Sequence, residues 1–172
     1  MKPPGKKSAA EWIQYLGLIK HPEGGWFKET YRSTENIKQE NLPTRFSDDR
    51  SFSTSIYFLL QSNEYSAFHR IKQDEIWYFH EGSSLTIYVI NENAECFELN
   101  LGKNLENREQ LQIIVEAGWL FAAKVNDQNS FTLAGCNVAP GFDFDDFEMP
   151  ERKQLLDLYP QHKSIIMQFS KE

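Results

Sequence analysis

Short segments rich in aromatic and β-branched residues recur along most of the chain, and turn-forming residues separate them. Each segment has the length of a strand, and the even spacing is typical of an antiparallel sandwich or barrel rather than of alternating strands and helices. The nine predicted strands are residues 26–32, 53–60, 75–80, 84–91, 95–101, 110–115, 119–125, 131–138 and 164–169. So many strands leave little of the 172 residues for helices. The sequence therefore predicts an all-β fold.

Two segments have helical patterns instead. Ser8 and Glu11 have the spacing of a capping box, apolar residues then recur with a helical period over 9–16, and Gly17 can end the helix. Residues 150–159 predict one late helix, which begins near a proline. The length fits one domain and the chain has no repeat or linker, so we expect a single domain over 1–172 with its core at about 21–169.

Two further segments interrupt the strand pattern. Residues 33–52 are polar and long, which is typical of either a mobile loop or a lid over an opening. Residues 142–147 alternate Phe with Asp, as in an exposed edge strand or a closing flap. Their spacing is not that of a calcium loop. We expect this segment to be structural, packing over the end of the barrel or against a partner subunit.

The charge balance excludes several classes of partner. The chain has 18 Lys and Arg against 25 Asp and Glu, a formal charge of −7, without a dense basic cluster, so it is not expected to bind nucleic acid. Its longest apolar run, 56–60, is far shorter than the roughly 20 residues that cross a bilayer. The basic N-terminus precedes no apolar stretch and does not resemble a secretory leader, so a cytoplasmic location is expected. Cys96 and Cys136 lack zinc-site spacing and are expected to be reduced thiols.

His69 and Glu75 are the first candidates for chemistry. They are six residues apart, so a continuous strand would place both on one face, and they can converge from neighbouring strands if a turn intervenes. Strand alternation puts Glu75 on the same face as Trp77 and Phe79. A carboxyl group among aromatic rings needs a partner or has a raised pKa. The alternative is that Glu75 is exposed at a strand start and His69 packs in the core.

The segment around this pair resembles the first motif of the cupin superfamily. His69, Glu75 and Gly82 match the His, Glu and Gly of that motif, and residues 21–33, 53–60 and 135–147 resemble the cupin-5 family, also known as DUF985. The resemblance covers about 9–169. It implies a double-stranded β-helix, or cupin jelly-roll barrel, here with a short N-terminal helix and one late helix, and usually a homodimer.

The same resemblance shows departures at the metal-binding positions. Metal-binding cupins use two His and a Glu from the first motif and a third His from the second motif. The second His position is Ile71 here, and the third falls on Phe121, with Glu116 in place of the motif's Pro. One His and one carboxylate are too few for a tight transition-metal site. We therefore expect no metal and no cofactor.

A metal-free barrel of this kind is expected to bind a small molecule. Trp77, Phe79, Trp119 and Tyr57 can stack on a sugar or another planar face, with His69 and Glu75 bonding its hydroxyl groups; each ring could equally belong to ordinary core. Glu29 shares a strand face with Phe27 and Tyr31, so it points inward or forms a dimer contact. The expected partners are a small molecule and a second copy of the chain.

Catalysis is the alternative. Metal-free cupins include the dTDP-4-keto-6-deoxysugar epimerases, in which a His removes a proton next to a ketone and a Tyr returns one. The resemblance suggests His69 as the base, oriented by a carboxylate such as Glu75, and Tyr57 or Tyr78 as the acid. Basic side chains would hold the diphosphate, and the candidates are Arg70, Lys72, Arg32 and Lys28. A third possibility is a structural or interaction domain with a vestigial pocket. We rank binding first, because no complete catalytic set can be read.

Overall fold

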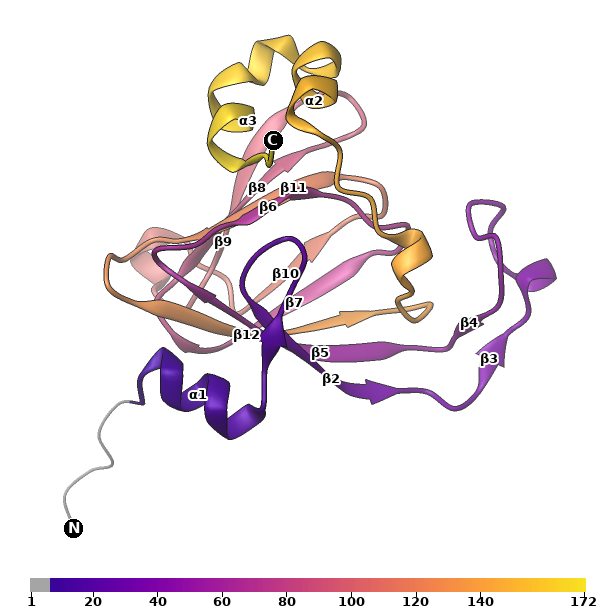
Figure 1. Cartoon of the computed structure of the whole chain (residues 1–172), viewed down its shortest axis with the longest axis horizontal. Helices are drawn as coiled ribbons and strands as arrows, with labels where there is room; N and C mark the ends of the chain where they lie inside the picture. Colours follow the sequence, from indigo (N-terminus) through magenta and orange to yellow (C-terminus); the bar gives the residue numbers. More distant parts are fainter. Residues whose placement is uncertain (1–6) are drawn as a thin grey trace.

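In a computed structural model, which describes residues 7–172, two antiparallel sheets face each other and enclose the core (Figure 1). The first sheet has the order β1-β2-β5-β12-β7-β10, and the second β6-β11-β8-β9. The strands are β1 Ile19–Lys20, β2 Trp26–Arg32, β5 Thr54–Gln61, β6 Ser66–His69, β7 Glu75–Gly82, β8 Leu85–Ile90, β9 Cys96–Leu101, β10 Gln112–Val115, β11 Leu120–Val125 and β12 Phe131–Val138. The predicted all-β double-stranded β-helix is confirmed.

Strand alternation fills the space between the sheets. On β5, Phe58 and Leu60 point into this core, whereas Tyr57 and Leu59 face the other side of the sheet. Trp77 of β7 lies in the same inter-sheet core and is 1% exposed. The fully buried aromatic and aliphatic side chains of both sheets therefore hold the barrel closed.

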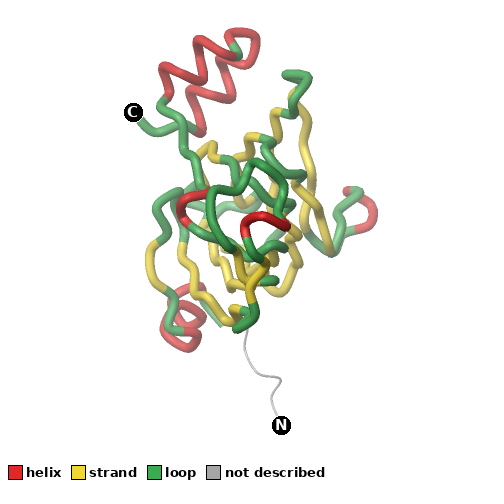
Figure 2. Tube along the Cα trace, turned by 90° about the vertical axis from the view of Figure 1, so that its right-hand side faces the viewer, coloured by secondary structure: helices red, strands yellow, loops and turns green. Residues whose placement is uncertain are grey.

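Helix α1, Ala9–Leu16, begins and ends as the sequence predicts. Ser8 and Glu11 form a reciprocal capping box, and Gly17 closes the helix with a φ of 65°. The helix covers the outer face of the six-stranded sheet, against a cluster that includes Leu59 and Leu133. Figure 2 shows α1 at one end of the strand body and the late helices at the opposite end.

The end of the chain differs from the prediction. Residues 164–169 were expected as a strand, but they belong to helix α3, Lys163–Phe169, which follows helix α2, Arg152–Leu158. The fold thus has two late helices, not one. The physical reason is spacing, because Ile166 and Phe169 lie three residues apart and pack together with Leu155 on the outer face of the four-stranded sheet. The short strand β6, Ser66–His69, was not predicted.

Residues 33–52 form an arm that projects from the barrel (Figure 1). It contains the strand pair β3, Asn36–Ile37, and β4, Arg50–Ser51, with a 3-10 turn at Gln39–Asn41. Residues 142–147, expected as an edge strand or flap, instead contain a 3-10 turn at Phe144–Asp146 and pack over the mouth of the barrel. We call residues 141–148 the mouth segment.

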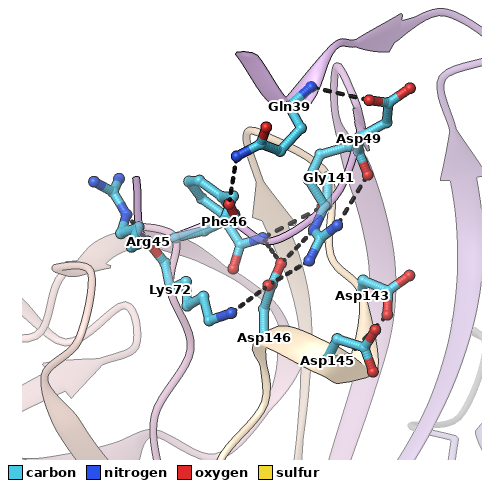
Figure 3. A network of polar contacts seen from close by, with 11 residues as sticks. Gln39, Arg45, Phe46, Asp49, Lys72, Gly141, Asp143, Asp145 and Asp146 are labelled. Atoms are coloured by element: carbon cyan, nitrogen blue, oxygen red, sulfur yellow. Dashed lines mark hydrogen bonds and ion pairs between the residues drawn. The ribbon is translucent and has the colours of Figure 1, made fainter. Parts of the chain in front are cut away.

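A buried carboxylate joins the arm to the mouth segment (Figure 3). Asp146 accepts two hydrogen bonds of 2.7 Å from the Arg50 guanidinium, and both side chains are at most 3% exposed. The Gln73 amide donates to Asp146 at 2.7 Å, and the Lys72 ammonium lies 3.3 Å from it. Burial would raise the pKa of Asp146, but these donors hold it below its usual value. The network therefore fixes the arm, the mouth segment and the turn at residues 72–73 relative to one another.

Other sequence expectations concern the cysteines, the membrane and the N-terminus. Cys96 and Cys136 are free thiols, as predicted. Among residues 7–172, no helix is long and apolar enough to cross a membrane. The expectation that the chain has no secretory leader concerns residues 1–6, which lie outside the described part.

Replacing Asp146 by Asn should lower the free energy of unfolding by about 3 kcal/mol, because it leaves the buried Arg50 guanidinium without a counter-charge. Asp145→Asn, at the exposed neighbouring carboxylate, is the matched control and should change stability little. Urea unfolding of both variants measures the difference. A loss of under about 1 kcal/mol for Asp146→Asn, as for a surface pair, would contradict this assignment.

Candidate functional site

A cavity of about 170 Å³ lies at one end of the space between the sheets, beneath the mouth segment. Its wall combines apolar rings and aliphatic side chains with several titratable groups. An apolar cavity of about 150 Å³ can hold benzene, so the volume suits one ring-sized group. The lining residues are His21, Glu23, Phe27, Glu29, Arg32, Thr54, Ile56, Phe58, His69, Ile71, Glu75, Trp77, Cys136, Val138, Phe142, Asp143, Phe144 and Phe147.

Glu23 reaches the cavity from the turn between β1 and β2. Gly24 has a φ of 122°, and a Cβ there would lie 2.1 Å from the Tyr65 carbonyl oxygen, so only glycine fits. This close approach lets the Glu23 carbonyl accept a 2.9 Å hydrogen bond from the Ala67 amide of β6. The turn is thus fastened to β6, and the Glu23 side chain lies beside His69.

The Glu23 carboxylate is buried but compensated. It lies 3.0 Å from His69 Nε2 and 3.3 Å from His21 Nδ1, and it accepts a 2.8 Å hydrogen bond from the Ser66 hydroxyl. Burial would raise the pKa of Glu23, but the two imidazoles and the hydroxyl hold it below its usual value. Glu23 is therefore an anion at neutral pH.

His69 sits between two oxygen atoms. Its Nδ1 lies 2.7 Å from the Ala67 carbonyl oxygen, which can only accept, so Nδ1 carries a proton. Its Nε2 faces the Glu23 carboxylate. When Nε2 also carries a proton, His69 and Glu23 form an ion pair. When that proton is lost, Nε2 has a free lone pair. Burial lowers the pKa of His69, and Glu23 and the Ala67 carbonyl offset this only in part. The Nε2 proton is thus held weakly, which suits a site of proton exchange.

Glu75 lies on β7 of the six-stranded sheet, opposite His69 of β6, and behaves differently from Glu23. It is 9% exposed and interacts with the Cys136 thiol. Burial, together with the nearby Glu23 charge, raises the pKa of Glu75 to about 8. The same burial and the Glu75 carboxyl raise the pKa of the Cys136 thiol. At neutral pH the cavity therefore holds a neutral carboxyl and a neutral thiol on one wall.

Two more charged side chains from β2 line the cavity. Glu29 accepts hydrogen bonds of 3.0 and 2.7 Å from the Arg32 guanidinium, and both are about 40% exposed. Asp143 adds a carboxylate from the mouth segment. The cavity is therefore lined by charged side chains at exposed positions as well as by the buried Glu23 carboxylate.

Five of the predicted candidate residues line this cavity: His69, Glu75, Trp77, Glu29 and Arg32. His69 and Glu75 do not share a strand, and they converge from β6 and β7 of the two sheets. Their convergence across an intervening turn is one of the two arrangements that the sequence allowed.

The other predicted site residues lie outside the cavity. Tyr57 faces the outer side of β5, where it packs with the α1 cluster and 5.8 Å from the ring of His80. Phe79 has the same strand parity as Trp77 but lies further along β7, against the inter-sheet core. Trp119 packs on Phe97 and bonds Glu92 through its indole. Tyr78, the alternative acid, does not line the cavity either.

Several lining residues were missed from the sequence. Glu23 and His21 lie in the family-like stretch 21–33 but were not predicted as site residues, and the role of Glu23 depends on contacts with residues more than 40 positions away. The two glycines after Glu23 were the available signal, because they indicate a close backbone approach. The mouth segment was expected over the barrel, but its three Phe rings were not assigned to a site.

The residues do not fit the metal centre that the cupin resemblance implies. Ile71 takes one ligand position, and the ring of Phe121 lies 4.0 Å from the His69 ring at another. His69 Nε2 is directed at Glu23. Among residues 7–172, no three His, Cys, Asp or Glu side chains are grouped to hold a metal ion. The absence of a cofactor stays a prediction, and no chemistry below is routed through a metal.

Comparisons with known proteins agree with this architecture. The family model described as Cupin superfamily (DUF985), cupin-5, matches residues 10–150. An uncharacterised protein of Saccharomyces cerevisiae is 30% identical over 154 residues, which are 84% of this chain and 76% of that protein.

Solved structures give the same result. A Shewanella oneidensis protein superposes with a TM-score of 0.87 at 41% identity, over 96% of this chain and 98% of that one. A hypothetical protein from Leishmania major has a TM-score of 0.87 at 34% identity, over 96% and 100%. Oxalate decarboxylase of Bacillus subtilis has a TM-score of 0.54 at 14% identity, over 89% of this chain and 37% of that one, and shows the fold alone.

The raised pKa of Glu75 predicts a pH-dependent stability. The folded state keeps this proton up to about pH 8, whereas the unfolded chain loses it near 4.5, so the free energy of unfolding falls as pH rises through that window. The slope is about 1.4 kcal/mol for each pH unit, or about 5 kcal/mol in all. Glu75→Gln removes this contribution, so its stability relative to wild type should increase from pH 4.5 to 8.

Urea unfolding at several pH values measures the difference. Glu98→Gln, at an exposed carboxylate on β9, is the control and should run parallel to wild type. Curves for Glu75→Gln that also run parallel to wild type would show that Glu75 is ionised in the folded protein.

Proposed function

Because the chain belongs to the cupin-5 family of the Cupin superfamily (DUF985), we propose that it is a metal-independent cupin that binds a compact small molecule in the barrel cavity. One observation carries the proposal: a ring-sized cavity is lined mainly by aromatic and aliphatic side chains, with hydrogen-bonding groups grouped on its wall. His69 and Glu23 bond the polar groups of the ligand in this proposal, and Trp77 and Phe58 pack on its body.

A second feature supports a bound ligand. Trp77 is 1% exposed, and its indole N–H has no hydrogen-bond partner among the described residues. An unsatisfied buried donor costs about 1–3 kcal/mol, so such groups commonly meet a ligand or an ordered water. A ligand with an acceptor oxygen would satisfy it.

The charged side chains that line the cavity indicate which classes of ligand it can bind. Glu23 and Asp143 oppose an anionic ligand, and the Arg32 guanidinium is already bound by Glu29. Dicarboxylates and the diphosphate of a sugar nucleotide are disfavoured for this reason. A single sugar ring without phosphate, or another compact ligand that is neutral or positively charged, fits better.

A thermal-shift panel tests binding. Monosaccharides, amino alcohols, dicarboxylates and sugar nucleotides are the probe classes, and a specific ligand at a hundredfold excess over its Kd should add about 2.7 kcal/mol, or about 5–10 °C in Tm. We expect hits among the first two classes. Ile71→Phe, which fills the cavity, should abolish the shift, whereas Leu111→Phe at an exposed position should keep it. Shifts that are equal in wild type and Ile71→Phe would overturn a site in this cavity.

Proton transfer at carbon is a second candidate function, because His69 holds its Nε2 proton weakly while Glu75 remains a neutral acid. His69 Nε2 would have to turn from Glu23 to the substrate, where it would remove a proton next to a ketone, as in the sugar-nucleotide epimerases. Glu75 would take the role expected of Tyr57. A diphosphate would have to lie outside the mouth, on the side of Arg32.

Solvent-deuterium exchange tests this candidate. In D₂O, wild type should replace the hydrogens next to the ketone of a dTDP-4-keto-6-deoxysugar, as followed by proton NMR. His69→Gln and Glu75→Gln should slow the exchange by about 100-fold or more. No exchange above the rate without protein would remove this candidate and leave the binding proposal intact.

A further inference from the structure

One carboxylate of the cavity has no close cation. Glu23 lies beside the imidazoles of His21 and His69, and Glu29 binds Arg32 at 2.7 Å. Asp143 lines the same cavity and forms no ion pair within 4 Å among the described residues. Glu75 is different, because burial, together with the nearby Glu23 charge, keeps it protonated. A ligand that brings a positive charge would complete the electrostatics of this site.

The mouth segment places three phenylalanine rings at the cavity, in the same segment as Asp143. The ring centroids of Phe142 and Phe144 are 5.1 Å apart and nearly perpendicular, and those of Phe144 and Phe147 are 6.2 Å apart at 75°. The rings pack edge to face, and all three line the cavity. Aromatic faces attract organic cations, and sets of aromatic rings bind methylated ammonium groups. Asp143 lies in the same segment between two of these rings in sequence and also lines the cavity.

Trp77 lines the same cavity and requires a different group. Its buried indole N–H has no hydrogen-bond partner among the described residues. An ammonium group cannot accept a hydrogen bond, so a ligand that also satisfies this N–H carries an oxygen. The cavity volume of about 170 Å³ limits the ligand to a compact molecule.

We propose that the ligand is a compact alkylammonium ion that bears a hydroxyl group. Its cationic head packs against Phe142, Phe144 and Phe147 beside Asp143, and its hydroxyl accepts a hydrogen bond from the Trp77 indole N–H. This inference rests on the proposed binding function and names its ligand class. Two imidazoles, those of His21 and His69, also face the cavity, and His69 is engaged by Glu23. The cation therefore meets carboxylates rather than free basic groups.

A pair of isosteric probes tests the charge. Choline and 3,3-dimethylbutan-1-ol have the same shape and hydroxyl, but only choline is charged. We expect choline to bind with a Kd at least about tenfold lower than that of the neutral alcohol, as measured by isothermal titration calorimetry up to about 10 mM ligand. Glucose serves as the neutral polyol probe.

Matched variants locate the charge. Asp143→Asn should weaken choline binding about threefold or more and leave the neutral alcohol unaffected. Asp145→Asn changes a neighbouring exposed carboxylate that does not line the cavity, so it should keep choline binding unchanged. Phe144→Ala should weaken choline more than Phe52→Ala, which replaces an exposed ring outside the cavity.

The outcomes separate this inference from the proposed function. If the neutral alcohol or glucose binds as tightly as choline, the cation inference is overturned and the binding function stands. If choline shows no heat of binding at about 10 mM, the inference is also overturned, and the wider panel decides the binding function by itself. Choline binding that survives Ile71→Phe would place the cation outside the cavity and contradict the inference.

Discussion

The burial of the Glu23 carboxylate is the constraint on which the pocket depends. Three acidic side chains are withdrawn from water in this barrel, and each is accommodated in a different way. Asp146 is paired with a guanidinium, Glu23 is held by imidazoles and a hydroxyl, and Glu75 keeps its proton. Because burying an uncompensated charge is costly, the first two stay ionised only beside their partners, whereas Glu75 is neutral. The protein thereby holds a carboxylate and a neutral carboxyl in one cavity at neutral pH.

The Asp146 network and the cavity that contains His69 and Glu75 are connected by the chain and by hydrogen bonds. Gln73 lies in the turn between His69 and Glu75, and its amide donates to Asp146, which directly precedes the cavity-lining Phe147. Arg50 of the arm binds the same carboxylate. The position of the aromatic rings at the mouth is therefore tied to the turn that sets the distance between His69 and Glu75. The arm therefore supports the mouth segment. From the sequence, this polar stretch was expected to be either a mobile loop or a lid.

Much of the fold could be predicted because strand periodicity is local. The alternation on β7 correctly grouped Glu75 with Trp77, and the capping residues of α1 fixed its start. Tyr57 was misplaced because both faces of β5 are covered, one by the opposite sheet and the other by α1, so alternation does not say which face lines a cavity. The last helix was read as a strand because a short apolar run fits both periods. Glu23 was missed because its burial depends on a turn that hydrogen-bonds to β6, and the two glycines after it indicate only a close backbone approach and not its partner.

The ionisation states of the buried carboxyl groups are the central claim, and carbon-13 NMR of glutamate side chains measures them most directly. With Glu23→Gln and Glu75→Gln variants for assignment, the account predicts that the Glu75 carboxyl titrates near pH 8 and that Glu23 titrates below its ordinary value. Two carboxyl signals that both titrate near 4.5 would contradict it, because the cavity would then be open to water and would lack the separate acid and base that define the site.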